Sequence, residues 1–139
     1  MREIELDTWE DTLALGRRLG RDAGVGSVIA LCGGLGAGKT HLTKGIAAGL
    51  GADPEVVSSP TFSLVQEYRG GRLPVYHFDF YRMESAEEVL AIGWDEYVEA
   101  GGVCVVEWAD LFPALLPEGT QWWRLELGAD GVRRAFREG

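Results

Sequence analysis

A glycine-rich segment that ends in a lysine and a threonine is the part of the sequence best suited to chemistry. Residues 33–40 are GGLGAGKT and match the pattern GxxxxGK[ST] of phosphate-binding loops. Glycines let successive backbone N–H groups turn toward a phosphate without interference from a Cβ atom, and a following helix presents its positive end to the same anion. The spacing predicts a nucleotide site in which Lys39 reaches the β- and γ-phosphates and the Thr40 hydroxyl ligates Mg²⁺.

Two acids further along the chain could complete such a site, which needs a carboxylate for the water shell of the metal and a group that orders the attacking water. Glu107 follows a fully apolar run, where a buried parallel strand would deliver an acid beside Thr40. Its alternative is an ordinary surface acid at a strand end. Asp79 ends another apolar segment and competes for the same role, or pairs with Arg82 in a structural turn.

Thr61 is a third candidate, because it comes just after the loop that leaves the predicted phosphate-loop helix. Its hydroxyl could reach the metal or the γ-phosphate, or the residue could simply begin a strand after Pro60. His77 is more typical of a structural histidine with satisfied hydrogen bonds than of a base or a ligand. Four tryptophans are interpreted mainly as core or interface residues: Trp94, Trp108, Trp122 and Trp123.

The segments around these residues alternate between strand and helix patterns. Thr8 followed by Asp11 indicates a capped helix start, and the Gly-Gly pair at 70–71 predicts an antiparallel hairpin. Strands are expected at 4–6, 27–31, 62–68, 73–79, 103–106, 121–127 and 132–136, and helices at 8–20, at 40–50 and from 85 onward. The order favours one α/β domain over residues 1–139, a P-loop NTPase-like three-layer fold with a mixed, mainly parallel sheet and antiparallel hairpins.

The composition limits which partners and which cellular compartment we expect for the protein. The 139 residues carry a net charge of −9, which argues against nucleic acid as the main partner, because phosphate neutralisation needs a clustered positive face. Cys32 and Cys104 lie beside apolar runs and are expected to be buried hydrophobes in a reducing cytoplasm. No targeting segment and no run of about eighteen apolar residues is recognised, so we expect a cytoplasmic protein without a membrane span.

Features that the sequence lacks also bear on the reaction. No NKxD-type segment specifies guanine, so ATP is favoured over GTP. There is no second large segment to hold an acceptor beside the γ-phosphate, and there is no lid-like insertion. Both absences weaken the hypothesis of a small-molecule kinase. ATP hydrolysis coupled to a conformational change is the leading hypothesis; a kinase and a nucleotide-sensing module without turnover are the alternatives.

Four segments in this order resemble one known family. They are GGLGAGKT at 33–40, SPTF at 59–62 followed by LVQEY at 64–68, HFDFYR at 77–82, and EW at 107–108. The chain resembles the TsaE (YjeE) family, the small bacterial P-loop ATPases of tRNA threonylcarbamoyladenosine biosynthesis, over about residues 8–110. The phosphate loop alone is generic, but the four segments together are specific.

The resemblance implies roles for individual residues. It implies that Thr40 and Glu107 hold Mg²⁺ and that Lys39 contacts the phosphates. It also implies that Thr61, Asp79 and Trp108 matter for hydrolysis, with Thr61 in a switch-like loop. The start of the first helix, around Thr8 and Trp9, is implied to lie against the adenine. The expected nucleotide-binding residues are Thr8, Gly33, Gly34, Leu35, Gly36, Ala37, Gly38, Lys39, Thr40 and His41.

The resemblance also implies partners. In the family, ATP hydrolysis drives cycles of a complex in which TsaB and TsaD transfer a threonylcarbamoyl group to the adenosine beside the anticodon. We therefore expect a partner-dependent ATPase that is weak alone and is not itself the transferase. The acidic chain would meet tRNA only indirectly, through the complex, and would offer the partners an acidic protein-binding surface.

Overall fold

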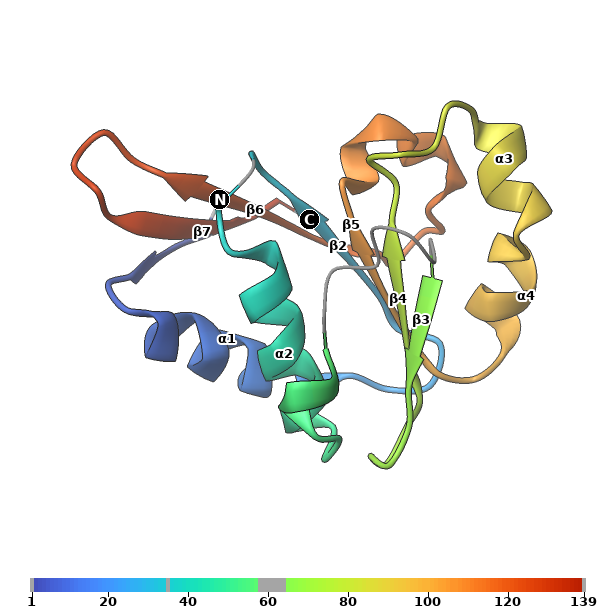
Figure 1. Cartoon of the computed structure of the whole chain (residues 1–139), viewed down its shortest axis with the longest axis horizontal. Coiled ribbons are helices and arrows are strands. Elements are labelled where there is room, and N and C mark those ends of the chain that lie inside the picture. Colours follow the sequence, from blue (N-terminus) through green and yellow to red (C-terminus); the bar gives the residue numbers. More distant parts are fainter. Residues whose placement is uncertain (1, 35, 58–64, 139) are drawn as a thin grey trace.

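The computed structural model describes residues 2–34, 36–57 and 65–138, and these form one seven-stranded sheet with helices on both faces (Figure 1). The strands are β1 (Arg2–Leu6), β2 (Val28–Cys32), β3 (Val65–Tyr68), β4 (Val75–Asp79), β5 (Val103–Glu107), β6 (Gln121–Leu127) and β7 (Arg133–Arg137). The α-helices are α1 (Trp9–Asp22), α2 (Lys39–Gly49), α3 (Ala86–Ala91) and α4 (Trp94–Glu99). Three 3₁₀ turns are η1 (Pro54–Val56), η2 (Ala109–Leu111) and η3 (Pro113–Leu115).

The strand order is β1-β7-β6-β2-β5-β4-β3, so neighbours in the sheet are mostly distant in the sequence. The central strands β6, β2, β5 and β4 are parallel to one another. Antiparallel pairing adds β7 and then β1 at one side and β3 at the other. Strands β2, β4 and β5 are buried along their whole length, which explains why they are largely apolar, apart from His77, Asp79 and Glu107. The predicted three-layer fold with a mixed, mainly parallel sheet is confirmed.

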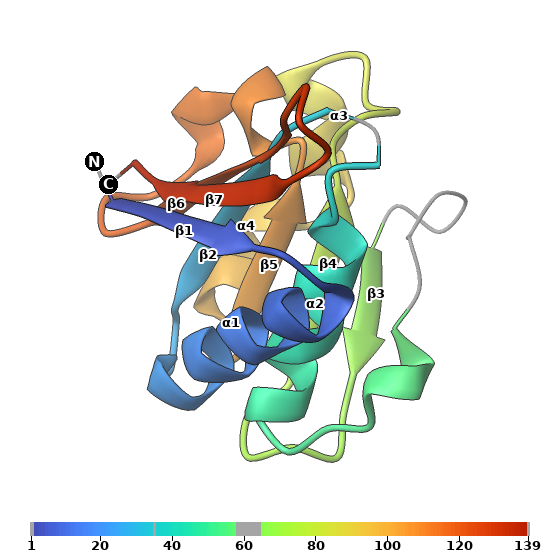
Figure 2. The ribbon, with the colours of Figure 1, turned by 90° about the vertical axis from the view of Figure 1, so that its left-hand side faces the viewer.

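Helices α1 and α2 cover one face of the sheet and pack unusually closely (Figure 2). Thr8 and Asp11 form the predicted capping box at the start of α1. A Cβ atom on Gly16 would lie 2.5 Å from the carbonyl oxygen of Leu42, and one on Gly45 would lie 2.5 Å from that of Leu13. The two helices therefore touch through their backbones, which fixes α2 tightly against α1.

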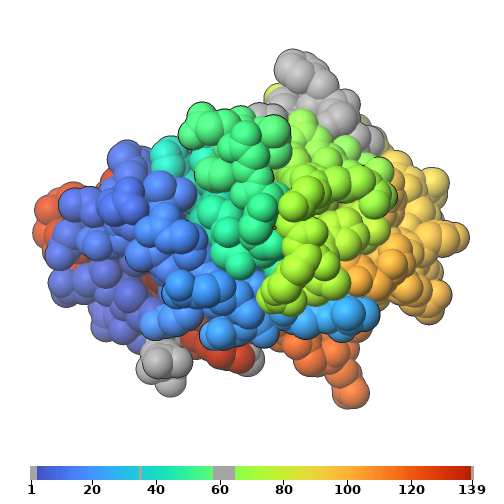
Figure 3. Space-filling model, turned by 90° about the horizontal axis from the view of Figure 1, so that it is seen from below, coloured from blue at the N-terminus to red at the C-terminus, as the bar shows by residue number. Residues whose placement is uncertain are grey.

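The turn between β3 and β4 closes the same layer from below. One guanidinium nitrogen of Arg72 donates to the carbonyl oxygens of Gly20, Arg21 and Ala23, at 2.7–3.0 Å. These carbonyls lie at the end of α1, where helical acceptors lack partners within the helix. Figure 3 shows this turn against the chain that leaves α1. The hairpin that carries β3 and β4 is thus tied to the α1–α2 layer.

Helices α3 and α4 cover the other face and pack through aromatic rings. Trp94, at the start of α4, meets Phe78 and Phe80 edge-to-face at centroid distances of 5.0 and 5.6 Å. Such crossed rings are the favoured geometry for aromatic pairs. Ser85 caps α3, as its position before Glu88 suggests. The separate helix α4, which begins after Gly93 in a left-handed conformation, was not predicted from the sequence.

Most element boundaries lie within three residues of those predicted. The expected strand 62–68 begins at Val65 in the described part of the chain, and its first three residues lie outside that part. Cys32 and Cys104 are buried free thiols, as predicted, and burial raises the pKa of each to about 12. No helix in the described ranges is both long enough and apolar enough for a membrane span.

A candidate nucleotide-binding site

The predicted phosphate loop joins the end of β2 to the start of α2. Gly33 has φ +138°, and a Cβ there would lie 2.2 Å from the carbonyl oxygen of Leu125 on β6. Gly38, the residue before α2, has φ +106°, and a Cβ there would lie 3.1 Å from the ring of Trp9. Only glycine satisfies both positions without strain. The loop therefore leaves the free N–H groups of the first turn of α2 facing a space between neighbouring elements.

Lys39 extends from the first residue of α2 back across the loop. Its side chain is almost fully buried, and Nζ donates to the carbonyl oxygens of Gly33 at 2.7 Å and Gly34 at 2.8 Å. The ammonium group also lies 4.3 Å from the ring centroid of Trp108, within cation–π range. Burial lowers the pKa of Lys39, against the opposing effect of nearby Glu107 and Asp79. A positive charge is thus held at the mouth of the loop by neutral acceptors.

Thr40 and Glu107 meet across the junction of α2 and β5. The Thr40 hydroxyl lies 3.3 Å from Glu107 Oε2 and 3.5 Å from Oε1. Glu107 is the last residue of β5, and its register partners are Leu31 on β2 and Asp79 on β4. Because these parallel strands end at the same edge of the sheet, their last side chains gather beside the start of α2.

Asp79 stands next to this pair at the end of β4. Its carboxylate accepts a hydrogen bond from the backbone N–H of Tyr81 at 2.9 Å, while Arg82 lies exposed at the rim. The sequence left open a structural turn in which Asp79 pairs with Arg82. The contact that Asp79 makes is instead this one with Tyr81. Burial raises the pKa of the Asp79 carboxyl; the Tyr81 N–H acts in the opposite direction. Asp79 is 9% exposed and lines the cavity described below.

Trp108 follows Glu107 directly and has a strained backbone. Its φ of 59° makes it the one non-glycine residue with positive φ among the described residues. The conformation is held by a hydrogen bond from its N–H to the carbonyl oxygen of Leu31 at 2.9 Å and by a ring contact with Tyr81 at 4.7 Å. Such outliers persist where surrounding structure imposes them and cluster at functional sites. The strain turns the indole ring over Lys39.

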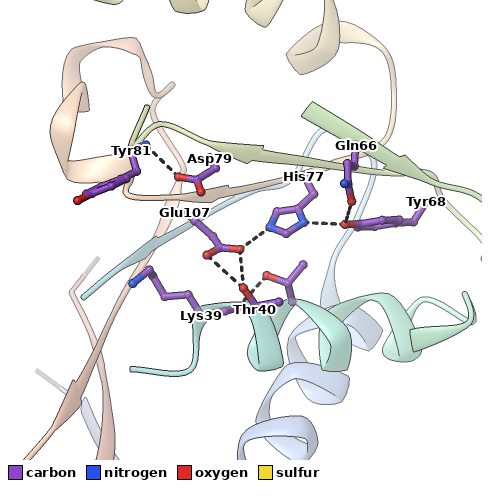
Figure 4. A network of polar contacts seen from close by, with 9 residues as sticks. Lys39, Thr40, Gln66, Tyr68, His77, Asp79, Tyr81 and Glu107 are labelled. Carbon is purple, nitrogen blue, oxygen red and sulfur yellow. Dashed lines mark hydrogen bonds and ion pairs between the residues drawn. The ribbon is translucent and has the colours of Figure 1, made fainter. Parts of the chain in front are cut away.

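Behind Glu107, a chain of hydrogen bonds leads to the edge of the sheet (Figure 4). His77 is completely buried; its Nε2 lies 2.6 Å from Glu107 Oε2 and its Nδ1 lies 2.8 Å from the Tyr68 hydroxyl. Tyr68 in turn donates to Gln66 Oε1 at 2.7 Å. The interpretation of His77 as a hydrogen-bonded structural histidine agrees with this placement, but it missed the partner. The sequence held a signal for this partner. His77 and Asp79 are two residues apart on one predicted strand, so their side chains lie on the same face as the site.

An aromatic and cationic stack lies beside the loop and the start of α2. The rings of Trp9 and His41 are stacked at 4.0 Å, and the Arg133 guanidinium lies 3.9 Å from the Trp9 ring. All three line a cavity of about 490 Å³ that also contains Lys39, Thr40, Asp79 and Glu107. A space of this size is typical of small-molecule sites. Thr8 caps α1 next to Trp9 and is not one of the lining residues.

Sequence reasoning missed several lining residues. Tyr81, Arg82 and Arg133 border the cavity, and only the first two fall in a segment that the sequence had marked. No local pattern points to Arg133, because β7 approaches the phosphate loop only through the strand order. Leu35 and Thr61 lie outside the described residues.

Comparison with known proteins gives the family. The family model described as "Threonylcarbamoyl adenosine biosynthesis protein TsaE" matches residues 6–136. The chain belongs to the TsaE family. The matched range contains every described residue of the site, from Trp9 to Arg133.

Two curated TsaE-family relatives and one solved structure illustrate the similarity. The tRNA threonylcarbamoyladenosine biosynthesis protein TsaE of Bacillus subtilis is 50% identical over 109 residues, which cover 78% of this chain and 67% of the relative. The protein of the same name from Treponema pallidum is 46% identical over 124 residues, covering 89% and 90%. The crystal structure of YdiB from Bacillus subtilis superposes with a TM-score of 0.80 at 36% identity, covering 98% of this chain and 83% of YdiB.

Proposed function

We propose that this protein is a magnesium-dependent ATPase that serves tRNA threonylcarbamoyladenosine biosynthesis as an accessory. The observation that carries the proposal is the convergence of Lys39, Thr40 and Glu107 at the end of a cavity of about 490 Å³ in a member of the TsaE family. The names of the relatives supply the pathway. The loop and the two oxygen donors supply the chemistry.

The phosphates would bind at the start of α2. Backbone N–H groups of the loop and the positive end of the helix favour an anion there. Lys39 would exchange its two carbonyl contacts for phosphate oxygens, a stronger charge-assisted bond. The flat stack of Trp9 and His41 suits the base of the nucleotide.

The residues fit a magnesium ion, because the Thr40 hydroxyl and the Glu107 carboxylate are the hard oxygen donors that Mg²⁺ prefers. A bound magnesium ion neutralises developing phosphate charge. Asp79 lies beside these donors and would orient the attacking water. The Trp108 ring, which contacts the Lys39 ammonium group, would keep that group directed at the phosphates. Thr61 remains a predicted hydroxyl donor outside the described residues.

The proposed partners are TsaB and TsaD, with tRNA reached only through them. The charge distribution supports this division, because residues 83–123 contain no Lys, Arg or His. The acids of that segment, which equal the whole net charge of −9, are Glu84, Glu87, Glu88, Asp95, Glu96, Glu99, Glu107, Asp110 and Glu118. All of these acids except the buried Glu107 reach the surface. A surface of this sign repels a phosphate backbone and suits a protein partner.

Substitution of the two lysines tests the nucleotide site. Lys39→Ala removes a charge-assisted phosphate contact, so ATP affinity should fall by about 1.5–3 kcal/mol, roughly 10- to 150-fold. Lys44→Ala, on the same helix but outside the cavity lining, is the matched control and should change affinity less than twofold. Isothermal titration calorimetry measures both. Equal affinities for Lys39→Ala and the unsubstituted protein would place the nucleotide elsewhere.

A second measurement separates hydrolysis from the two alternatives. Phosphate release with TsaB and TsaD present should depend on Mg²⁺ and disappear in Glu107→Ala. Labelled γ-phosphate found on a small molecule would favour a kinase. Tight ATP binding without any phosphate release in the presence of both partners would favour a nucleotide sensor.

A further inference from the structure

A line of polar side chains crosses the apolar layer between the sheet and helices α1 and α2. It runs from Gln66 and Tyr68 on β3, through His77 on β4 and Glu107 on β5, to Thr40 on α2 (Figure 4). Alternation along the strands places these strand residues on one face. The same face of β4 and β5 otherwise carries Val75, Val103 and Val105. Valine would be the ordinary occupant of position 77, so a histidine there requires a reason.

The histidine ring is held at both nitrogens. His77 is completely buried, and its two contacts, to Glu107 Oε2 at 2.6 Å and to the Tyr68 hydroxyl at 2.8 Å, lie on opposite sides of the ring. Glu107 Oε2 faces Nε2 as a hydrogen-bond acceptor, and the imidazole donates to it through the N–H at Nε2. With Nδ1 also engaged, the ring cannot turn without breaking a buried hydrogen bond, which costs free energy.

The contact involves the acid that faces Thr40. Oε2, the oxygen held by His77, is also the one nearer to the Thr40 hydroxyl, at 3.3 Å. A glutamate side chain has three rotatable bonds, and fixing them opposes folding or binding through lost entropy. An acid that is already held in place does not bear that cost when the ligand arrives. Partners of this kind behind a metal ligand commonly govern metal affinity.

We propose that His77, supported by Tyr68, is a positioning residue that holds the Glu107 carboxylate in the orientation a magnesium–nucleotide complex requires. The inference rests on the proposed nucleotide function and names two residues of the same site that act through Glu107. It also connects the acid to β3, the edge strand of the sheet, through two successive hydrogen bonds. A displacement of β3 at Tyr68 would therefore loosen the acid that faces Thr40.

A purely structural role for His77 makes a different prediction. If the ring served only to fill the layer, its replacement would lower the free energy of unfolding and leave the response to Mg²⁺ unchanged. The useful variants are therefore His77→Phe, which keeps a planar ring without donors, His77→Gln, which restores an N–H donor, and Tyr68→Phe, which removes a single oxygen atom. Tyr76→Phe is the matched control, since Tyr76 lies on β4 in the cluster on the opposite face.

The experiment measures the Mg²⁺ concentration that half-saturates the complex with a non-hydrolysable ATP analogue, by titration calorimetry, beside analogue affinity in EDTA. His77→Phe should raise the half-saturating Mg²⁺ concentration at least tenfold, while affinity in EDTA stays within twofold. Tyr68→Phe should raise it about threefold, and His77→Gln should recover most of the loss. Tyr76→Phe should match the unsubstituted protein.

Wild-type Mg²⁺ dependence in both His77→Phe and Tyr68→Phe would overturn the proposal. If His77→Phe does not fold, as judged by circular dichroism, Tyr68→Phe decides alone. Failure of the proposed function would look different, because the unsubstituted protein would then show neither analogue binding nor a response to Mg²⁺.

Discussion

The two helical layers of this protein are built by different means. On one face, α1 and α2 touch through their backbones, because Gly16 and Gly45 leave no room for a Cβ atom. On the other face, the short helices α3 and α4 are anchored by aromatic rings such as Trp94. The polar line through His77 and Glu107 belongs only to the first face.

The difference indicates that the α1–α2 layer is suited to position a site and that the α3–α4 layer is suited to stabilise the fold. Backbone-to-backbone contact leaves few alternative positions for α2, whose first residues carry Lys39 and Thr40. Aromatic burial stabilises strongly, and no residue of α3 or α4 lines the cavity. We therefore expect substitutions in the α1–α2 layer to alter nucleotide binding, and those in the α3–α4 layer to alter stability alone.

The largest effect should come from Trp94→Ala. Trp94 is 1% exposed, and its indole N–H donates to the carbonyl oxygen of Leu115 at 2.9 Å. Its loss should lower the free energy of unfolding by about 3–5 kcal/mol, measured in urea, while the folded fraction keeps its ATP affinity within twofold. Trp94→Phe should cost less, since a ring remains. A fall in ATP affinity that parallels the lost stability would contradict the division between the layers.

Next in size is Gly45→Ala. The added Cβ would lie 2.5 Å from the carbonyl oxygen of Leu13 and 2.8 Å from Cα of Gly16, so α1 and α2 must separate. We expect a loss of about 3 kcal/mol in unfolding free energy and a tenfold fall in ATP affinity, because α2 carries the phosphate loop. Gly24→Ala, where nothing lies within 4 Å of the new atom, is the control for both measurements. Unchanged affinity in a destabilised Gly45→Ala protein would show that the helix position does not tune the site.

The smallest effect concerns Asp79→Asn and has opposite signs for stability and activity. Burial raises the pKa of Asp79 in the folded protein above its unfolded value of 3.8, so this carboxyl favours folding most at low pH. That contribution is lost as the pH rises through the folded pKa. Asp79→Asn should therefore raise the Tm at pH 7 by about 2–4 °C and flatten its fall with pH, while ATP hydrolysis slows and ATP binding persists.

Exposed Asp95→Asn on α4 should leave both the Tm and its pH dependence unchanged, which supplies the comparison for Asp79. Calorimetric melting from pH 4 to 8 measures the two variants. A lower Tm at pH 7 for Asp79→Asn would mean that the ionised carboxylate stabilises the fold.

Many helices and strands of this protein could be predicted from the sequence, because neighbouring residues determine them. The cap at Thr8, the hairpin around 70–71 and the buried strands each depend on neighbouring residues, and all appear in the structure. Helix α4 escaped prediction because its six residues hold little periodicity and its start depends on the left-handed Gly93. Helices this short take their stability from packing, here of Trp94 against β4.

The sequence by itself predicted the phosphate loop, named Glu107 and Asp79 as candidate acids and indicated the α/β class, because spacing and strand ends carry these signals. Only the tertiary structure decided that His77 holds Glu107 and that Arg133 meets Trp9. The physical reason is the strand order: β5 lies between β2 and β4, and β7 lies between β1 and β6, so these contacts join residues that no local pattern relates. Register then selects the face, because a shift of one residue would turn His77 away from Glu107.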